Sequence, residues 1–124
     1  ALTRLLLREG CARILADREH GPTVASAERA AQAAAGARGR VLGFAAADLS
    51  AADGADLLFD AATRVSGRVD MLVNNAGLGI YGRIDQIPRA DWERVLQVNL
   101  VAPMRLTELA LPQMLARRSG HVVN

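Results

Sequence analysis

The chain has 124 residues, a length that suits one ordinary domain, and 51% of its residues are hydrophobic. Charged residues make up 23%, which is typical of a soluble globular protein. The formal net charge is only +2, and the aromatic residues are one Trp, one Tyr and two Phe. A nucleic-acid partner is therefore not expected, because binding nucleic acid calls for a basic surface and for aromatic side chains on which bases stack.

No apolar run approaches the roughly 20 residues that a membrane-spanning helix needs, and Arg4 and Arg8 interrupt the apolar stretch near the start. We therefore expect neither a membrane partner nor a signal peptide. The single cysteine, Cys11, excludes an internal disulfide, fits a reducing cytoplasm and is expected to serve packing. His20 and His121 have no cysteine or carboxylate at ligand spacing, so no metal site is predicted.

Apolar spacing and helix breakers predict alternating helices and strands along the chain. A first helix places Leu2, Leu5 and Leu6 on one face and ends at Gly10. Strands are predicted, in chain order, over residues 12–16 (closed by Asp17), 41–46, 69–73 and 120–124. Helices are predicted over 25–35, from a Ser50–Asp53 capping box to Gly67, and over about 91–117, with a loop over 78–88.

Strands that alternate with helices of this length predict an α/β fold with a doubly wound parallel sheet of the Rossmann type. Residues 1–124 contain no repeat or linker, so we treat them as part of a single domain. A nucleotide-binding sheet begins with a strand and a glycine-rich turn, whereas this chain opens inside a helix. Because that strand lies mid-sheet, the sheet is expected to be incomplete, with the strands near Leu15 and Leu72 left unpaired on facing edges.

Asn74-Asn75-Ala76-Gly77 follows directly behind the third predicted strand. Ligands of open α/β sheets bind just past such strand ends. The run from Val73 to Gly77 resembles the signature of the short-chain dehydrogenase/reductases, and the resemblance covers nearly all 124 residues as the central portion of that family's domain. It implies structural and cofactor-contacting roles for Asn74, Asn75, Ala76 and Gly77. The alternative is a turn and nothing more.

Two acidic residues that end strands acquire cofactor roles from the same resemblance. Asp17 would accept hydrogen bonds from the adenosine ribose and select NAD, while the adjacent Arg18 is of the type that the family uses for NADP. Because an acidic residue at the ribose usually decides the preference, we favour NAD over NADP. The alternative is that Asp17 and Arg18 form a solvated pair with no cofactor role. Asp48 and Leu49 would lie at the adenine ring, through the Asp48 carboxylate and a backbone N–H.

Asn99 matches the family's active-site asparagine, whose main-chain carbonyl holds a water in a proton relay. The residues themselves offer a route to that role. Pro103 lies four positions on and has no N–H, so in a continuous helix the Asn99 carbonyl loses its partner and the helix is expected to kink. A plain helix kink is the alternative.

Other features of the second half are less specific. Trp92, Val95 and Leu96 form an apolar stripe that is expected to face the core, with part of it free for contact between subunits, as in the family. Pro112 predicts a second break or a helix end. Tyr81, past a strand end, either contacts a substrate or packs on the domain.

The resemblance implies an oxidoreductase that moves a hydride between NAD(P) and a carbonyl or secondary alcohol, as a cytoplasmic homodimer or homotetramer acting on a small molecule. The family's catalytic serine would fall about three residues beyond Asn124, with Tyr-x-x-x-Lys further on. Tyr81 cannot supply that pair because Asp85 stands four residues later, and all 15 basic residues are arginine. If the chain ends at Asn124, a non-catalytic nucleotide-binding or scaffolding homologue, or an inactive fragment, is the alternative.

Overall fold

A computed structural model describes residues 2–17 and 39–124. The strands are β1 (Ala12–Asp17), β2 (Arg40–Ala46), β3 (Met71–Val73) and β4 (His121–Val123). The helices are α1 (Leu2–Arg8), α3 (Gly54–Ser66), α4 (Arg89–Leu96), the π-helical turn η1 (Gln97–Val101) and α5 (Ala102–Ala116). The predicted helix over 25–35 lies outside the described residues. No helix within the described ranges is both long and apolar enough to cross a membrane.

The described strands form two parallel pairs. β1 pairs with β2, where Asp17 lies opposite Ala46, and β3 pairs with β4, where Val73 lies opposite Val123. In the described part of the chain, β1 and β3 are not hydrogen-bonded to each other. This arrangement agrees with the expected incomplete sheet, in which the strands near Leu15 and Leu72 do not meet.

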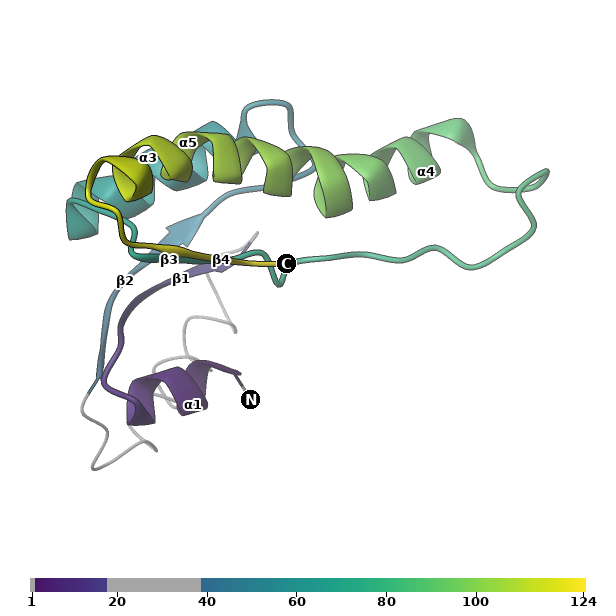
Figure 1. The fold of residues 1–124 in the computed structure, drawn as a ribbon. Coiled ribbons are helices and arrows are strands. Elements are labelled where there is room, and N and C mark those ends of the chain that lie inside the picture. The colour runs from purple at the N-terminus through teal and green to yellow at the C-terminus, as the bar shows by residue number, and fades with distance from the viewer. Residues whose placement is uncertain (1, 18–38) are drawn as a thin grey trace.

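The helices lie in layers on the two sides of the strands. α3 packs against β1, β2 and α5, and α5 also packs against β3. Figure 1 shows α3, α4 and α5 above the strands and α1 below them. Parallel strands with helices on both sides confirm the α/β, Rossmann-type prediction.

The core lies beneath α5, whose inner face is built from every fourth residue of the helix. The buried members of this row are Val98, Ala102, Leu106, Ala110 and Met114. Ala55 of α3 joins the row at its centre, and the partly buried side chains of Leu49, Leu58, Phe59 and Leu72 pack around it.

The predicted core stripe through Trp92 does not face this core. α4 has no buried residue, and Leu96 is 47% exposed. The reason is position: α4 extends beyond the strands, so no sheet lies under it in the described part of the chain (Figure 1). Trp92 is half-buried and instead lies 5.8 Å from the guanidinium of Arg89.

Helix ends follow the predicted glycines at both Gly10 and Gly67. Gly10 has φ 91° and closes α1, with Gly10 N donating to Leu7 O and Cys11 N donating to Leu6 O. Gly67 has φ 74° and closes α3. In α1, however, Leu7 is the buried residue at 1% exposure, while Leu5 of the predicted face is exposed.

Two local predictions were wrong. Ser50 does not cap α3: the helix begins at Gly54, the N-cap residue Asp53 makes no side-chain cap bond, and the Ser50 hydroxyl donates to Asp48 instead. Pro112 does not end α5, which continues to Ala116. Pro112 lies on the exposed side of the helix, so the carbonyl that it leaves without a partner can bind water while the opposite face stays packed.

Candidate functional site

Asn74 stands where β3 and β4 end together, and it connects the two strands. Its backbone N–H donates to Val123 O at 2.8 Å, and its side-chain Nδ2 donates to Asn124 Oδ1, also at 2.8 Å. Its Oδ1 is buried and accepts no hydrogen bond from the described residues. A buried acceptor without a donor is costly, so this atom is suited to receive a hydrogen bond from a group that binds at this edge.

The backbone past Asn74 is open. Asn75, Ala76 and Gly77 are all exposed. A Cβ placed on Gly77 would touch only Asn99 Oδ1, at 3.4 Å, and one on Gly79 would touch nothing within 4 Å. This stretch therefore offers bare main chain to which a ligand can approach closely.

Asn99 reaches this segment from the helical layer. Its Nδ2 donates to Leu78 O at 2.8 Å, and its Oδ1 accepts from Leu78 N at 2.9 Å. The oxygen and the nitrogen of the Asn99 side-chain amide thus both bind Leu78, the loop residue that follows Gly77. The sequence indicated Asn99 through its main-chain carbonyl alone; no local pattern relates positions 78 and 99, and the same is true of Asn74 and Asn124.

The helix around Asn99 is interrupted by a π-helical turn at the position where the sequence predicted a kink. Ala102 N–H donates to Gln97 O, five residues back, and Pro103 has no N–H to offer. The Asn99 carbonyl therefore lacks the donor that a regular α-helix would supply at the fourth residue on.

A second group of predicted residues ends the other strand pair. Asp17 is the last residue of β1, and Arg18 lies outside the described residues. Asp48 follows β2 by two residues, and its Oδ1 accepts from Ser50 N at 2.9 Å and from Ser50 Oγ at 2.7 Å. The side chain of Leu49 packs against the core. Asp48 thus closes a tight turn onto Ser50, and the contact of Asp48 and Leu49 with the adenine stays a prediction.

The short chain dehydrogenase family model matches residues 1–124. The chain belongs to the short-chain dehydrogenase family. Within the chain, the strand-end segment from Asn74 to Gly77 and Asn99 at the π-helical turn are the residues that the sequence resemblance indicated.

Curated relatives match the chain over shorter stretches. A ketoacyl reductase, HetN, of Nostoc sp. is 40% identical over 67 residues, which are 54% of this chain and 23% of the relative. Human retinol dehydrogenase 8 is 41% identical over 59 residues, which are 48% of this chain and 19% of the relative. The matched part is thus about a quarter or less of these relatives' length.

Solved structures match almost the whole chain. A metagenomic short-chain oxidoreductase in complex with NADP has 30% identity and a TM-score of 0.81, over 98% of this chain and 52% of that one. L-sorbose reductase from Gluconobacter frateurii, complexed with NADPH and L-sorbose, has 26% identity and a TM-score of 0.78, over 98% and 44%. The chain thus spans about half the length of these short-chain dehydrogenases.

The residues of the site fit a dinucleotide. The exposed main chain of Asn75 to Gly77 and the unpaired, buried Oδ1 of Asn74 lie together at one strand end. No group of three or more potential metal-ligating side chains occurs among the described residues. The features at this edge suit an organic ligand held by hydrogen bonds and close approach.

Tyr81 does not pack against the domain within the described ranges, because its side chain is 99% exposed. It lies in the loop between β3 and α4, which extends away from the strands (Figure 1). Arg83 pairs with Asp85 through two hydrogen bonds of 3.0 Å in this loop, and the same contact lowers the pKa of Asp85. Of the two predicted roles for Tyr81, packing on the described domain is therefore wrong, and contact with a substrate stays a prediction.

Proposed function

We propose that the protein containing this chain is an NAD(P)-dependent oxidoreductase that transfers a hydride between the nicotinamide and a carbonyl or secondary alcohol. The observation that carries the proposal is the Asn99 clamp on Leu78, which joins the π-helical turn to the Asn74–Gly77 edge. The NADP and NADPH complexes of the two solved relatives support a nicotinamide cofactor.

The cofactor would supply the hydride chemistry, and the residues of the chain would hold it in place. Asn75, Ala76 and Gly77 would offer main chain for close approach, and Asn74 Oδ1 would accept a hydrogen bond. Asp48 and Leu49 would receive the adenine. We further propose that Asp17 binds the ribose hydroxyls and favours NAD over NADP, with Arg18 acting in the opposite direction.

The proposed role of Asn99 is to hold a water through its main-chain carbonyl. Pro103, at the fourth position on, has no N–H to offer this carbonyl in α-helical register. A fixed water at that point can pass a proton to or from the acid–base group that serves the substrate oxygen. The side chain meanwhile keeps Leu78, and with it the cofactor edge, at a constant distance from the helix.

The test replaces Pro103 by alanine in the active protein. Pro103→Ala restores an N–H near the Asn99 carbonyl, so kcat should fall by about tenfold or more while the KM for the cofactor is unchanged. Pro112→Ala is the matched control, because it removes the other proline of α5 on an exposed face. Equal kcat values for the two variants would remove Asn99 from the relay. Ratios of kcat/KM with NADH and NADPH test the NAD preference.

We also propose that the protein is a cytoplasmic homodimer or homotetramer that acts on a small molecule. An exposed apolar row follows the outer side of α4 and α5 at spacings of four and seven residues: Leu96, Leu100, Met104, Leu111 and Leu115. Exposed Glu108 interrupts this row between Met104 and Leu111, and the apolar residues on either side of it suit a helix that packs on a second copy.

A further inference from the structure

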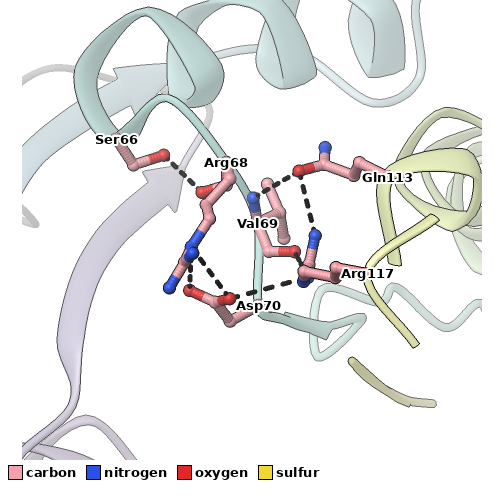
Figure 2. Close-up of polar contacts among 6 residues, drawn as sticks. All are labelled: Ser66, Arg68, Val69, Asp70, Gln113 and Arg117. Atoms are coloured by element: carbon pink, nitrogen blue, oxygen red, sulfur yellow. Dashed lines mark hydrogen bonds and ion pairs between the residues drawn. The ribbon is translucent and has the colours of Figure 1, made fainter. Parts of the chain in front are cut away.

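The residue that leads into β3 is held by side chains of α5 rather than by a strand (Figure 2). Gln113 Oε1 accepts from Val69 N at 2.9 Å, and Arg117 Nη2 donates to Val69 O at 2.6 Å. Gln113 and Arg117 are one helical turn apart, so both reach the same point. They satisfy both backbone groups of Val69, as a neighbouring strand would, and this is why β3 begins at Met71 and not at the predicted Val69.

Other contacts fix the Arg117 guanidinium in place. It lies 3.5 Å from Gln113 Oε1 and 3.6 Å from the carboxylate of Asp70, which Arg68 contacts from the other side (Figure 2). The Arg117 side chain is only 22% exposed. A charged donor at low exposure makes a stronger and more directional bond than one in water. The position of Arg117 at the C-terminal end of α5 also suits the helix dipole.

The contacts of Gln113 and Arg117 with Val69, which we call the Val69 clamp, lie next to the start of the β3–β4 pairing. His121 N donates to Asp70 O at 3.1 Å, Met71 lies opposite His121, and the ladder ends where Asn74 N meets Val123 O. β3 is three residues long, so few ladder bonds oppose a slip. A slip of one residue would turn the Asn74 side chain to the other face of the strand.

We propose that Gln113 and Arg117 are positioning residues that set the register of β3 and so aim Asn74 at the cofactor edge. They act through Val69, five residues before Asn74, and touch no part of the site themselves. The role of Asn74 toward a cofactor rests on the proposed function, whereas the register claim does not.

The test uses Gln113→Met, which keeps the side-chain length and removes the acceptor for Val69 N. Gln113→Glu restores an acceptor and is the rescue variant. Arg117→Met removes the donor to Val69 O, and Arg94→Met is the control for loss of one positive charge, because Arg94 is exposed on α4 and has no ion pair among the described residues. Amide hydrogen exchange is followed by NMR, and binding of NADH and of NADPH by the fluorescence of the reduced nicotinamide.

Gln113→Met and Arg117→Met should each speed exchange of the Asn74 amide by about tenfold, while Ala110 in the middle of α5 keeps its protection. Gln113→Glu and Arg94→Met should exchange as the parent protein does, and the reduced cofactor (NADH or NADPH) should bind more weakly only to Gln113→Met and Arg117→Met. Unchanged Asn74 exchange, or faster exchange at Asn74 and Ala110 alike, would overturn the proposal. Selective exchange at Asn74 in a protein that binds neither NADH nor NADPH would support the Val69 clamp and refute the proposed function instead.

Discussion

Asn99 uses the donor and the acceptor of its side-chain amide on the same loop residue, so the identity of both atoms matters. Asn99→Asp keeps an acceptor for Leu78 N but places a second oxygen against Leu78 O. We expect the variant to lose about 1 to 3 kcal/mol of local stability, because a donor is replaced by a repelling acceptor.

Faster hydrogen exchange at the Leu78 amide measures this loss. Gln86→Glu makes the same amide-to-acid change in the same loop and should leave Leu78 unaffected. Equal exchange at Leu78 in the parent protein and in Asn99→Asp would show that the clamp does not form.

The residue types at the site could be predicted, but their pairings could not. Asn74, Asp48 and Asn99 stand out because each follows a strand or precedes a proline, which are local patterns. The bond from Asn99 to Leu78 spans 21 positions and the one from Val69 to Gln113 spans 44, so each exists only after the helix has packed on the sheet. Local propensity contains no information on such contacts.

At the scale of elements, the start of α3 is fixed by contact between main chains. A Cβ on Gly54 would overlap the carbonyl of Asp48, the residue predicted at the adenine. Gly54→Ala should therefore destabilise the fold by about 1 to 3 kcal/mol, although alanine favours the helix itself.

Urea unfolding measures that change. Gly79→Ala is the control, because a Cβ there meets nothing within 4 Å. Equal midpoints for the two variants would mean that α3 can move away from Asp48 at no cost.

α3 and α5 are also joined by an ion pair, and this pair gives stability a pH dependence. Arg105 Nη2 donates to Asp56 Oδ1 at 2.6 Å, and its Nε lies 3.1 Å from both Asp56 oxygens. Hydrogen bonds from Arg105 lower the pKa of Asp56 below its ordinary value of 3.8. The pair therefore stabilises the fold above that value, and the stabilisation is lost as the pH falls through the lowered pKa.

Asp56→Asn removes the charge, so the variant should unfold at a lower temperature than the parent protein at pH 7. The difference between the two should shrink as the pH falls below 3.8. Thermal unfolding at a series of pH values measures it. A difference that persists unchanged to low pH would assign the effect to packing rather than to the charge.

Element boundaries were predicted well where a single residue decides them, as Gly10 and Gly67 do. The sequence predicted a kink at Pro103 but not its π-helical form, which depends on how Ala102 pairs with Gln97. The core stripe was misplaced because apolar periodicity does not distinguish a face that meets the sheet from one beyond its edge. Trp92 and Leu96 lie on a helix face beyond the edge of the sheet.

At the scale of the whole molecule, the outer row of α4 and α5 predicts self-association. Leu100 is 52% exposed within this row, and Leu57 on α3 is 53% exposed outside it. Leu100→Glu should weaken association by about tenfold or more, because it places a charge in an apolar contact, whereas Leu57→Glu should not. Sedimentation over a range of protein concentrations measures both, and equal behaviour would exclude this row as the interface.

The layered arrangement could be predicted because alternating strands and helices allow few topologies. The separation into two strand pairs followed from strand order, since the strand near Leu15 and the strand near Leu72 are not neighbours in the family's sheet. Substrate choice could not be predicted. Of the described residues past the strand ends, Tyr81 is the candidate contact, and its exposed side chain has no neighbour that defines a pocket.

Hydride transfer at the edge that Asn74, Gly77 and Asn99 form is the reaction that we propose for the protein. The most direct measurement supplies the protein with NADPH or NADH deuterated at the transferring carbon and a set of ketones, and analyses the alcohols by mass spectrometry. We expect one deuterium on the carbinol carbon, and a lower rate for Pro103→Ala than for Pro112→Ala. Binding of the cofactor without deuterium in any product would contradict it.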